Sequence, residues 1–350
     1  AYGYYYFYKT GTVVTDAIFN IGGFIDNSLP SQSISPEYIS YGLRDDLKNN
    51  PILLKEKQYT AYRTDTLPLV FAGNLSNNLK FKSDDPVYNQ NLVLNSLTQT
   101  QGNVLTYSPK VAKIKVTDSE LNQEKKKFTV TRTSDKEGSV TFTFDGLKPK
   151  ETAYVQFGKD LMGFADPLTT YHATQDRNNK PELSITINKK DVRLQPQVKQ
   201  LIGVRANQKG QVQIKWSLAG NKRILTSEIP RLVNINSTLL RSKVSQVNNK
   251  KQMHLTTFRD NYLSGKINTT KNENLVTTIP YSRGWKVKVD GKPVKVSRTL
   301  NVFIGLNMKP GKHTVVMRYR TPGLLIGVIT SIIGIILLVV FNGYLEKKKY

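Results

Sequence analysis

The sequence contains no cysteine, which excludes disulfide bridges, thiolate metal ligands and cysteine nucleophiles. Its three histidines, His172, His254 and His313, lie in separate segments and lack the close spacing of metal-binding motifs. No P-loop, GxGxxG turn or GxSxG nucleophile elbow stands between a predicted strand and a predicted helix. We therefore expect no metal site, no cofactor and no catalytic residue in this chain.

Acidic residues are also few, since 26 Asp and Glu stand against 51 Lys and Arg, for a formal net charge of +25. This balance favours anionic polymers or anionic lipid headgroups as partners. Nucleic acid is not expected, because no basic–aromatic nucleic-acid motif is recognisable. The closest acidic pairs are Asp45-Asp46 and Asp84-Asp85, and the second is interpreted as a cap ahead of Pro86. A pair of carboxylates from distant segments, as a glycosidase needs, stays open.

One long segment carries no charge at all. Residues 323–344, GLLIGVITSIIGIILLVVFNGY, are long enough to cross a hydrocarbon core of about 30 Å. The basic residues of LEKKKY follow directly, and positive residues beside a membrane segment tend to stay cytoplasmic. We predict a cell-membrane protein with a transmembrane helix over 321–345, a cytoplasmic tail over 346–350 and residues 1–320 outside. The aromatic cluster AYGYYYFY at residues 1–8 indicates an earlier membrane segment of a larger protein.

Residues 1–103 are predicted to form a mixed α/β membrane-proximal region. Cap residues and proline punctuation define its elements. The predicted elements are a helix from Ser35 and Pro36 to Lys48, a strand over 59–73 broken at Pro68, and a helix from Asp85 to Gly102. The second helix is rich in Asn and Gln, so we expect one of its faces to meet another polar surface or a partner domain.

From residue 104 onward the chain alternates apolar and polar residues between turn signals, which is typical of β-strands. We predict a β-sandwich over 104–226 and a helix plus a second β-rich region over 227–320. Tyr154 follows a Leu-x-Pro corner, which resembles the tyrosine corner of immunoglobulin-like sandwiches. The helix is expected to open at Pro230 and to continue through RLVNINSTLLRSKVSQV.

The predicted fold class is therefore mainly β with some α. It comprises one or two sandwich domains of an immunoglobulin-like or jelly-roll kind, short helices and one C-terminal transmembrane helix. A Lys-Pro turn followed by a strand occurs at 147–157 and again at 308–319. Whether the two β-rich regions are a duplication stays open, because a shared turn-strand device produces the same pattern.

The segment YSRGWKVKVDGKPVKV, residues 281–296, places basic residues and a tryptophan around an Asp-Gly turn. Strand alternation puts the tryptophan on one face with valines and the first lysines on the other, so the tryptophan is interpreted as a packing residue rather than a sugar platform. The candidates for binding an anionic polymer are Arg283, Lys286, Lys288, Lys292 and Lys295. The residues interpreted as a structural signature are Tyr281, Gly284, Trp285, Asp290, Gly291, Gly311, His313 and Tyr319. The alternative that these basic residues form only a solvated surface, with no ligand, stays open.

Two long segments carry a family resemblance. IPYSRGWKVKVDGKPV at 279–294 and GLNMKPGKHTVVMRYRTPGLLIGVITSIIGII at 305–336 resemble the C-terminal part of the YfhO family of bacterial membrane proteins. Segments 67–102 and 258–267 fit the same family. The order of these segments, ending in a membrane helix, is more specific than any one of them.

The resemblance implies a large multi-pass protein related to the GT-C glycosyltransferases of the bacterial cell envelope. The resemblance also implies an activity that transfers sugars from an undecaprenyl-phosphate carrier to polymers such as the lipoteichoic acid of Gram-positive bacteria. The catalytic carboxylate of GT-C enzymes lies in an early loop, so this chain is expected to hold only the extracytoplasmic module, which positions the acceptor, and the last membrane helix. Its partners would be the membrane, teichoic acid or anionic lipid, and its own N-terminal membrane domain. The alternatives are a non-catalytic module that binds a wall polymer or anionic lipid, and a β-sandwich glycosidase.

Overall fold

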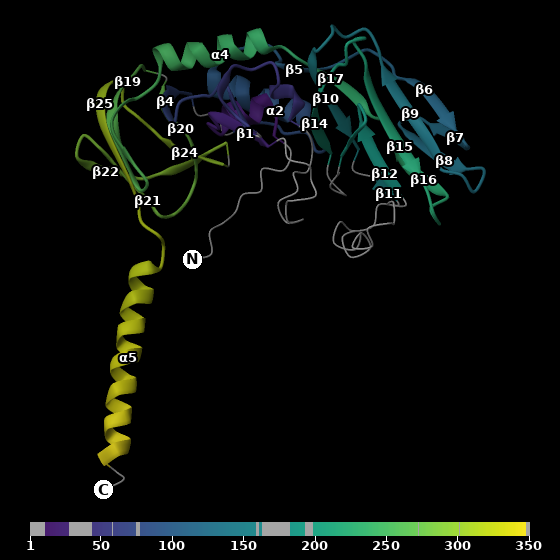
Figure 1. Ribbon diagram of the computed structural model, residues 1–350. Helices are drawn as coiled ribbons and strands as arrows, with labels where there is room; N and C mark the ends of the chain where they lie inside the picture. The colour runs from purple at the N-terminus through teal and green to yellow at the C-terminus, as the bar shows by residue number, and fades with distance from the viewer. Residues whose placement is uncertain are drawn as a thin grey trace. The chain divides into compact units, whose positions relative to one another are not determined.

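The computed structural model describes residues 11–27, 44–57, 59–74, 78–158, 161–162, 183–192, 199–271, 273–300 and 302–347 (Figure 1). The chain divides into two compact units. Unit 1 comprises Ala1–Leu67 and Leu79–Gln246, and unit 2 comprises Pro68–Asn78 and Val247–Tyr350. The described residues form six antiparallel sheets and a few helices, so the prediction of a mainly β fold is confirmed.

Unit 1 contains four of the sheets, with strand orders β1-β3-β2, β14-β10-β17-β5, β11-β16-β8-β7 and β13-β12-β15-β9-β6. Their strands are β1 (Gly23–Asn27), β2 (Ile52–Glu56), β3 (Tyr59–Arg63), β5 (Leu105–Tyr107), β6 (Lys113–Thr117), β7 (Ser119–Glu124), β8 (Lys127–Arg132), β9 (Gly138–Phe144), β10 (Thr152–Phe157), β11 (Leu161–Met162), β12 (Leu183–Ile187), β13 (Lys190–Asp191), β14 (Gln200–Arg205), β15 (Val212–Leu218), β16 (Ile224–Glu228) and β17 (Arg231–Ile235). Alternating burial along β8 and β9 reflects the alternation of apolar and polar residues in their sequences.

An aromatic cluster forms the main core of unit 1. Trp216 on β15 is fully buried, and its ring centre lies 5.4 Å from those of both Phe128 and Phe142. The ring centre of Phe157 on β10 lies 5.8 Å from that of Trp216. Because β8, β9 and β10 belong to three different sheets, this one core joins three sheets into a single body.

The helices of unit 1 are α1 (Val13–Ile18), the 3-10 helix η3 (Asp45–Leu47), α2 (Pro86–Thr98) and most of α4 (Ser237–Lys250). Helix α2 begins where the sequence predicts, since the Asp85 carboxylate accepts a hydrogen bond from the Tyr88 amide at 3.0 Å. It ends before the predicted Gly102, because Gln99 takes a left-handed conformation with φ of 56°. The predicted helix from Ser35 lies mostly outside the described residues, as do residues 1–8 and His172.

The helix predicted to open at Pro230 is wrong in its first half. Residues 231–235 form strand β17, which pairs with β10 on one side and β5 on the other. Helix α4 starts only after Asn236, whose side-chain oxygen accepts a hydrogen bond from the Leu239 amide at 2.9 Å. The apolar residues of the segment fit both the helical period of about 3.6 and the strand period of about 2. The segment forms a strand because it can pair with β10 and β5.

Unit 2 contains two sheets, with strand orders β18-β19-β25-β21-β22 and β23-β24-β20-β4. Their strands are β4 (Val70–Gly73), β18 (His254–Arg259), β19 (Tyr262–Thr269), β20 (Asn274–Pro280), β21 (Trp285–Val289), β22 (Lys292–Val294), β23 (Ser297–Thr299), β24 (Phe303–Leu306) and β25 (Gly311–Tyr319). Both sheets contribute to one buried core, with Met317 from β25 and Ile304 from β24 fully buried in it. Helix α5 (Leu324–Lys347) follows β25, and its residues Leu324–Leu345 are long and apolar enough to cross a membrane.

Candidate functional site

The basic hairpin singled out from the sequence consists of β21 and β22. Asp290 and Gly291 connect the strands with φ angles of 50° and 78°, the left-handed backbone that a type I′ turn requires. Asp290 is also held by a neighbouring strand, because its carboxylate accepts hydrogen bonds from the Thr314 amide at 2.8 Å and from His313 Nδ1 at 2.7 Å. The turn is therefore fixed by its own backbone and by β25.

His313 links this turn to a second one. Its Nε2 lies 2.8 Å from the carbonyl oxygen of Lys309, so both ring nitrogens have an oxygen partner. The hydrogen bond to Asp290 raises the pKa of His313, and the same bond lowers the pKa of Asp290. These contacts make His313 a turn-holding residue rather than a free base.

The inner face of the hairpin packs against the core of unit 2. Trp285 is half-buried, and its ring centre lies 5.3 Å from that of Tyr319 on β25. Gly284 precedes it at a point of close approach: a Cβ there would lie 2.4 Å from the Arg320 carbonyl oxygen and 2.5 Å from the Tyr319 ring. No larger residue fits without moving the end of β25, which explains a glycine at this position.

The outer face of the same sheet carries lysines. Lys286 and Lys288 are exposed on β21, and the register aligns them with Arg318 and Val316 of β25. By the same alternation Lys266 of β19 and Lys312 of β25 share this face. We call Lys266, Lys286, Lys288 and Lys312 the lysine face. None of the four forms an ion pair with another residue among those described, so their charges are available to a ligand.

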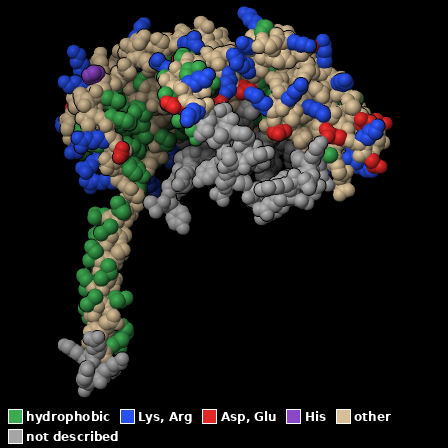
Figure 2. Space-filling model, viewed as in Figure 1, with side chains coloured by type: hydrophobic (Ala, Val, Ile, Leu, Met, Phe, Trp, Pro, Cys, Tyr) green, Lys and Arg blue, Asp and Glu red, His purple; other side chains and the backbone are tan. Residues whose placement is uncertain are grey.

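The five predicted polymer-binding residues do not share one surface. Lys292 pairs with Val289 and so lies on the opposite side of the sheet from Lys286 and Lys288. Arg283 lies before β21 and Lys295 after β22, both exposed. Figure 2 shows the wide distribution of Lys and Arg side chains over the visible surface. The hairpin therefore contributes two lysines to a larger surface made by three strands.

Of the Asp45-Asp46 pair, only Asp46 belongs to a buried ionic cluster of unit 1, because Asp45 accepts a hydrogen bond from the exposed Lys190 at 2.7 Å. Arg44 donates hydrogen bonds to Asp46 at 3.1 Å and to Asp16 on α1. The Tyr154 hydroxyl donates to Asp46 at 2.8 Å and accepts from the Val13 amide at 2.8 Å. Asp16, Asp46 and Tyr154 are at most 2% exposed. We call Asp16, Arg44, Asp46 and Tyr154 the buried ionic cluster.

This cluster corrects the expected tyrosine corner. Such a corner bonds the tyrosine hydroxyl to backbone a few residues upstream, but the partners of Tyr154 are 108 and 141 residues away. The hydroxyl instead connects β10 to η3 and α1. Gly203 on β14 makes room for the arrangement, since a Cβ there would lie 2.0 Å from the Asp46 carboxylate.

The electrostatics of the cluster are those of a closed ion pair. Burial opposes the charge of Arg44, but Asp46 and Asp16 outweigh it and raise the pKa of Arg44. Burial raises the pKa of Asp46, while hydrogen bonds from Arg44 and Tyr154 act against that rise. Two carboxylates joined to one buried guanidinium are a structural arrangement, and they lack the open separation that a glycosidase pair needs.

No group of three or more potential metal ligands occurs among the residues that the structure describes. Sequence reasoning missed the contact of Asp16 with Arg44, because 28 residues separate them and neither lies in a motif. It also missed Lys266 and Lys312 as partners of the hairpin lysines. Their strand alternation was visible, but the order of strands in the sheet was not.

Comparison with known proteins agrees with the membrane helix and the resemblance of the hairpin. The family model described as "Bacterial membrane protein YfhO" matches residues 3–331. An uncharacterized protein YfhO of Bacillus subtilis (strain 168) is 32% identical over 89 residues, which are 25% of this chain and 10% of that protein. The match thus spans about a tenth of that relative's length.

A solved structure, a conserved protein of unknown function from Pseudomonas aeruginosa PAO1, matches with 7% identity and a TM-score of 0.15. That match covers 59% of this chain and 93% of the other, and a score this low carries no argument about fold. The family model, in contrast, covers nearly the whole chain, including the hairpin, β25 and the start of α5. The chain therefore belongs to the YfhO family of bacterial membrane proteins.

Proposed function

We propose that this chain is the extracytoplasmic and C-terminal membrane part of a GT-C-like glycosyltransferase. The complete enzyme would add sugars from an undecaprenyl-phosphate carrier to a cell-envelope polymer such as lipoteichoic acid. In this proposal the sheets of each unit form β-sandwiches outside the cell, and α5 ends in the cytoplasm. Membership of a membrane-protein family and one apolar C-terminal helix support this arrangement.

The lysine face is the observation that carries the proposed role. Four ammonium groups on one sheet face, none with an acidic partner among the described residues, attract a polymer of repeated phosphates through many weak, exposed contacts. Only residues 320–323 separate the sheet from α5, so a polymer held there stays close to the membrane. The module would thus present an anionic acceptor to an active site contributed by another part of the enzyme.

Binding of poly(glycerol phosphate) to the whole chain in detergent tests this role. We expect binding that weakens steeply as salt rises, because exposed charges are screened within about 10 Å at 0.1 M salt. A variant with Gln at positions 266, 286, 288 and 312 should lose most of it. A matched control replaces four exposed lysines of unit 1 with Gln, namely Lys126, Lys136, Lys148 and Lys209. Equal losses of polymer binding in both variants would show that binding depends on net charge and not on the lysine face.

The transferase assignment needs a separate test. A strain lacking the complete gene should lose a sugar decoration on its teichoic acids, detected by compositional analysis of the purified polymer. Unchanged decoration would contradict the assignment. The chain by itself should show no sugar transfer. Activity of this chain alone would show that the catalytic group lies within it, which contradicts the proposal.

The second candidate is a non-catalytic module that binds a wall polymer or anionic lipid. It is favoured by the burial and pairing of Asp16 and Asp46, since these carboxylates are bound to Arg44 while the lysines of the lysine face are exposed. Polymer binding together with unchanged teichoic-acid decoration would select this candidate.

A further inference from the structure

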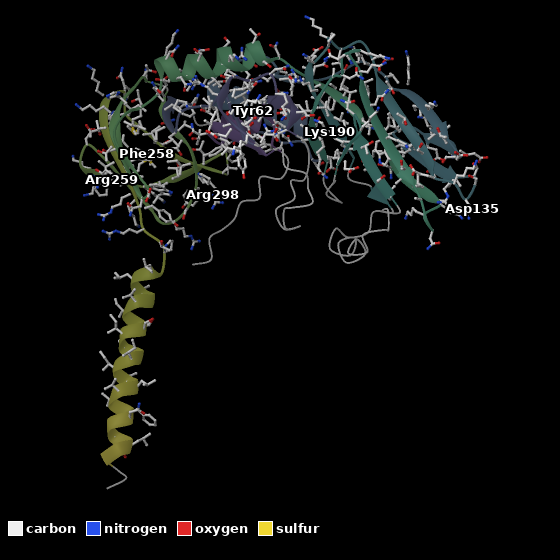
Figure 3. All side chains as sticks on the ribbon, in the orientation of Figure 1. Tyr62, Asp135, Lys190, Phe258, Arg259 and Arg298 are labelled. Atoms are coloured by element: carbon white, nitrogen blue, oxygen red, sulfur yellow. The ribbon has the colours of Figure 1, made fainter. Side chains whose placement is uncertain are left out.

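Arginine and lysine are segregated in unit 2. Its lysines occur along much of the chain, but its five arginines all lie at one end of the unit. We call this set the arginine end: Arg259, Arg283, Arg298, Arg318 and Arg320. Figure 3 labels two of them, Arg259 and Arg298.

The five arginines come from four separate segments, and strand register places two of them, Arg259 and Arg318, in one row. Arg259 on β18 pairs with Tyr262 on β19, which pairs with Arg318 on β25, which pairs with Lys286 on β21. This row crosses the sheet at the C-terminal end of β25, just before the chain continues to α5. Lys286 is the lysine that joins the row.

The remaining arginines are attached to the same end by backbone and ring contacts. The Arg320 amide donates a hydrogen bond to the Gly284 carbonyl at 2.9 Å, which places Arg283 beside the end of β25. The Arg298 guanidinium lies 4.7 Å from the ring centre of Tyr281, two residues before Arg283. Two sheets therefore contribute to the arginine end.

All five arginines are exposed, and none forms an ion pair with any residue that the structure describes. Asp260, in the turn after Arg259, is the acidic residue nearest in sequence to any of them. Aromatic side chains accompany the arginines: Phe258 is 65% exposed, and Trp285 and Tyr319 are in contact with each other. Exposed arginines with half-buried tryptophan and tyrosine are typical of a protein surface at the membrane interface.

Covalent geometry keeps this end near the bilayer. Residues 320–323 join β25 to α5, and five extended steps reach at most about 18 Å. The charge-free part of α5 starts at Leu324, so the hydrocarbon boundary lies at the start of that helix. Arg318 and Arg320 are therefore within one short linker of the headgroup layer. Strand register brings Arg259 with them, and the hydrogen bond from Arg320 to Gly284 brings Arg283.

We propose that the arginine end binds the phosphate groups of lipid headgroups on the membrane surface at which α5 enters the bilayer. The planar guanidinium donates two parallel hydrogen bonds to a phosphate, which an ammonium group cannot do. Phe258 would insert beside the headgroups. Docking of this kind fixes the orientation of unit 2 on the membrane and leaves three members of the lysine face, Lys266, Lys288 and Lys312, for a different ligand. It does not depend on the proposed polymer binding, which rests mainly on other residues.

Tryptophan fluorescence of the whole chain in lipid nanodiscs tests the proposal. The chain has two tryptophans; Trp216 is fully buried and serves as an internal reference, while Trp285 reports on the arginine end. In discs of phosphatidylglycerol with a nitroxide on the headgroup, Trp285 emission should be quenched. A variant with Gln at all five arginine positions should lose that quenching. Arg320→Gln alone should shift the ratio of docked to undocked chains by about fivefold, if one basic residue at an anionic surface contributes ~1 kcal/mol.

Three controls separate the outcomes. A variant with Gln in place of Lys266, Lys288, Lys292, Lys295 and Lys309 makes the same change of net charge and should keep the quenching. The five-fold Arg→Lys variant keeps the charge and should give an intermediate result. Unchanged melting temperatures in detergent show that any loss is not unfolding. Equal quenching in wild type and the five-Gln variant would overturn the proposal, as would an equal loss in the lysine control. Loss of quenching on addition of soluble poly(glycerol phosphate) would assign the arginine end to the polymer instead.

Discussion

Arg44 of unit 1 and the five arginines of unit 2 have opposite roles. In unit 1 the Arg44 side chain is 9% exposed and bound to two carboxylates, so its charge is neutralised inside the fold. In unit 2 five arginines are exposed and have no ion-pair partner among the described residues. The difference shows that burial and pairing, rather than residue type, decide which cations stabilise the fold and which are available for binding.

The largest effect is expected from Arg44→Met. It leaves Asp16 and Asp46 buried without a counter-charge, which costs about 3–5 kcal/mol in the free energy of unfolding. Denaturant unfolding followed by Trp216 fluorescence measures it. The matched change Arg259→Met, at an exposed arginine, should cost no more than about 0.5 kcal/mol. Similar values for the two variants would remove the distinction between the units.

Tyr154→Phe should have the next largest effect. The buried hydroxyl bonds both Asp46 and the Val13 amide, and its loss leaves two buried polar groups short of a partner. We expect a cost of about 1–3 kcal/mol, measured by the same unfolding transition. A change within experimental error would mean that the hydroxyl does not hold η3 and α1 to β10.

Lysine offers a second comparison of the same kind. Lys243 on α4 is 1% exposed, and its ammonium donates to Asn95 at 2.8 Å, Thr100 at 2.6 Å and the Gln101 carbonyl at 2.9 Å. Lys243→Met should destabilise the protein by about 1–3 kcal/mol, because these acceptors lose their donor. Lys288→Met, on the lysine face, should change the melting temperature very little. Equal shifts in melting temperature would contradict this contrast.

The smallest effect concerns pH at the hairpin turn. The pKa of His313 is raised above 6.5 by Asp290, so its stabilising bond is fully present below 6.5 and is lost as pH rises through the raised value. The pKa of Asp290 is lowered below 3.8, so its contribution is present above 3.8 and is lost as pH falls through the lowered value. NMR titration of the His313 ring measures the first, and Asp290→Asn should return that pKa toward 6.5. A His313 pKa that does not respond to Asp290→Asn would exclude the bond in solution.

Local signals in the sequence predicted the local parts of this fold. The Asp-Gly pair at 290–291 defines a two-residue turn, and Asp85 ahead of Pro86 marks the start of α2, because both depend on neighbouring residues alone. The residues 231–235 carry no local signal that separates strand from helix. Their strand conformation depends on β10 and β5, which lie far away in sequence.

The surfaces of unit 2 were predictable only in part, for the same reason. Alternation separates Trp285 from Lys286 within one strand, but only the order of strands places Arg259 and Arg318 in one row. One signal was visible beforehand: Arg259, Arg283, Arg318 and Arg320 each lie within two residues of an aromatic side chain. Arg298 has no such neighbour in sequence and reaches Tyr281 through the fold.

The membership of β4 in unit 2 has a consequence for the order of synthesis. Val70 pairs with Thr277, so this buried strand leaves the ribosome long before its partner exists. At translation rates of about 5–20 residues per second, the apolar segment around Phe71 waits roughly 10–40 s for β20. Unit 1, whose last strand precedes residue 247, is complete earlier. Unit 2 can close only after unit 1 is made, and a gene fragment starting at residue 247 would encode its second sheet without an edge strand.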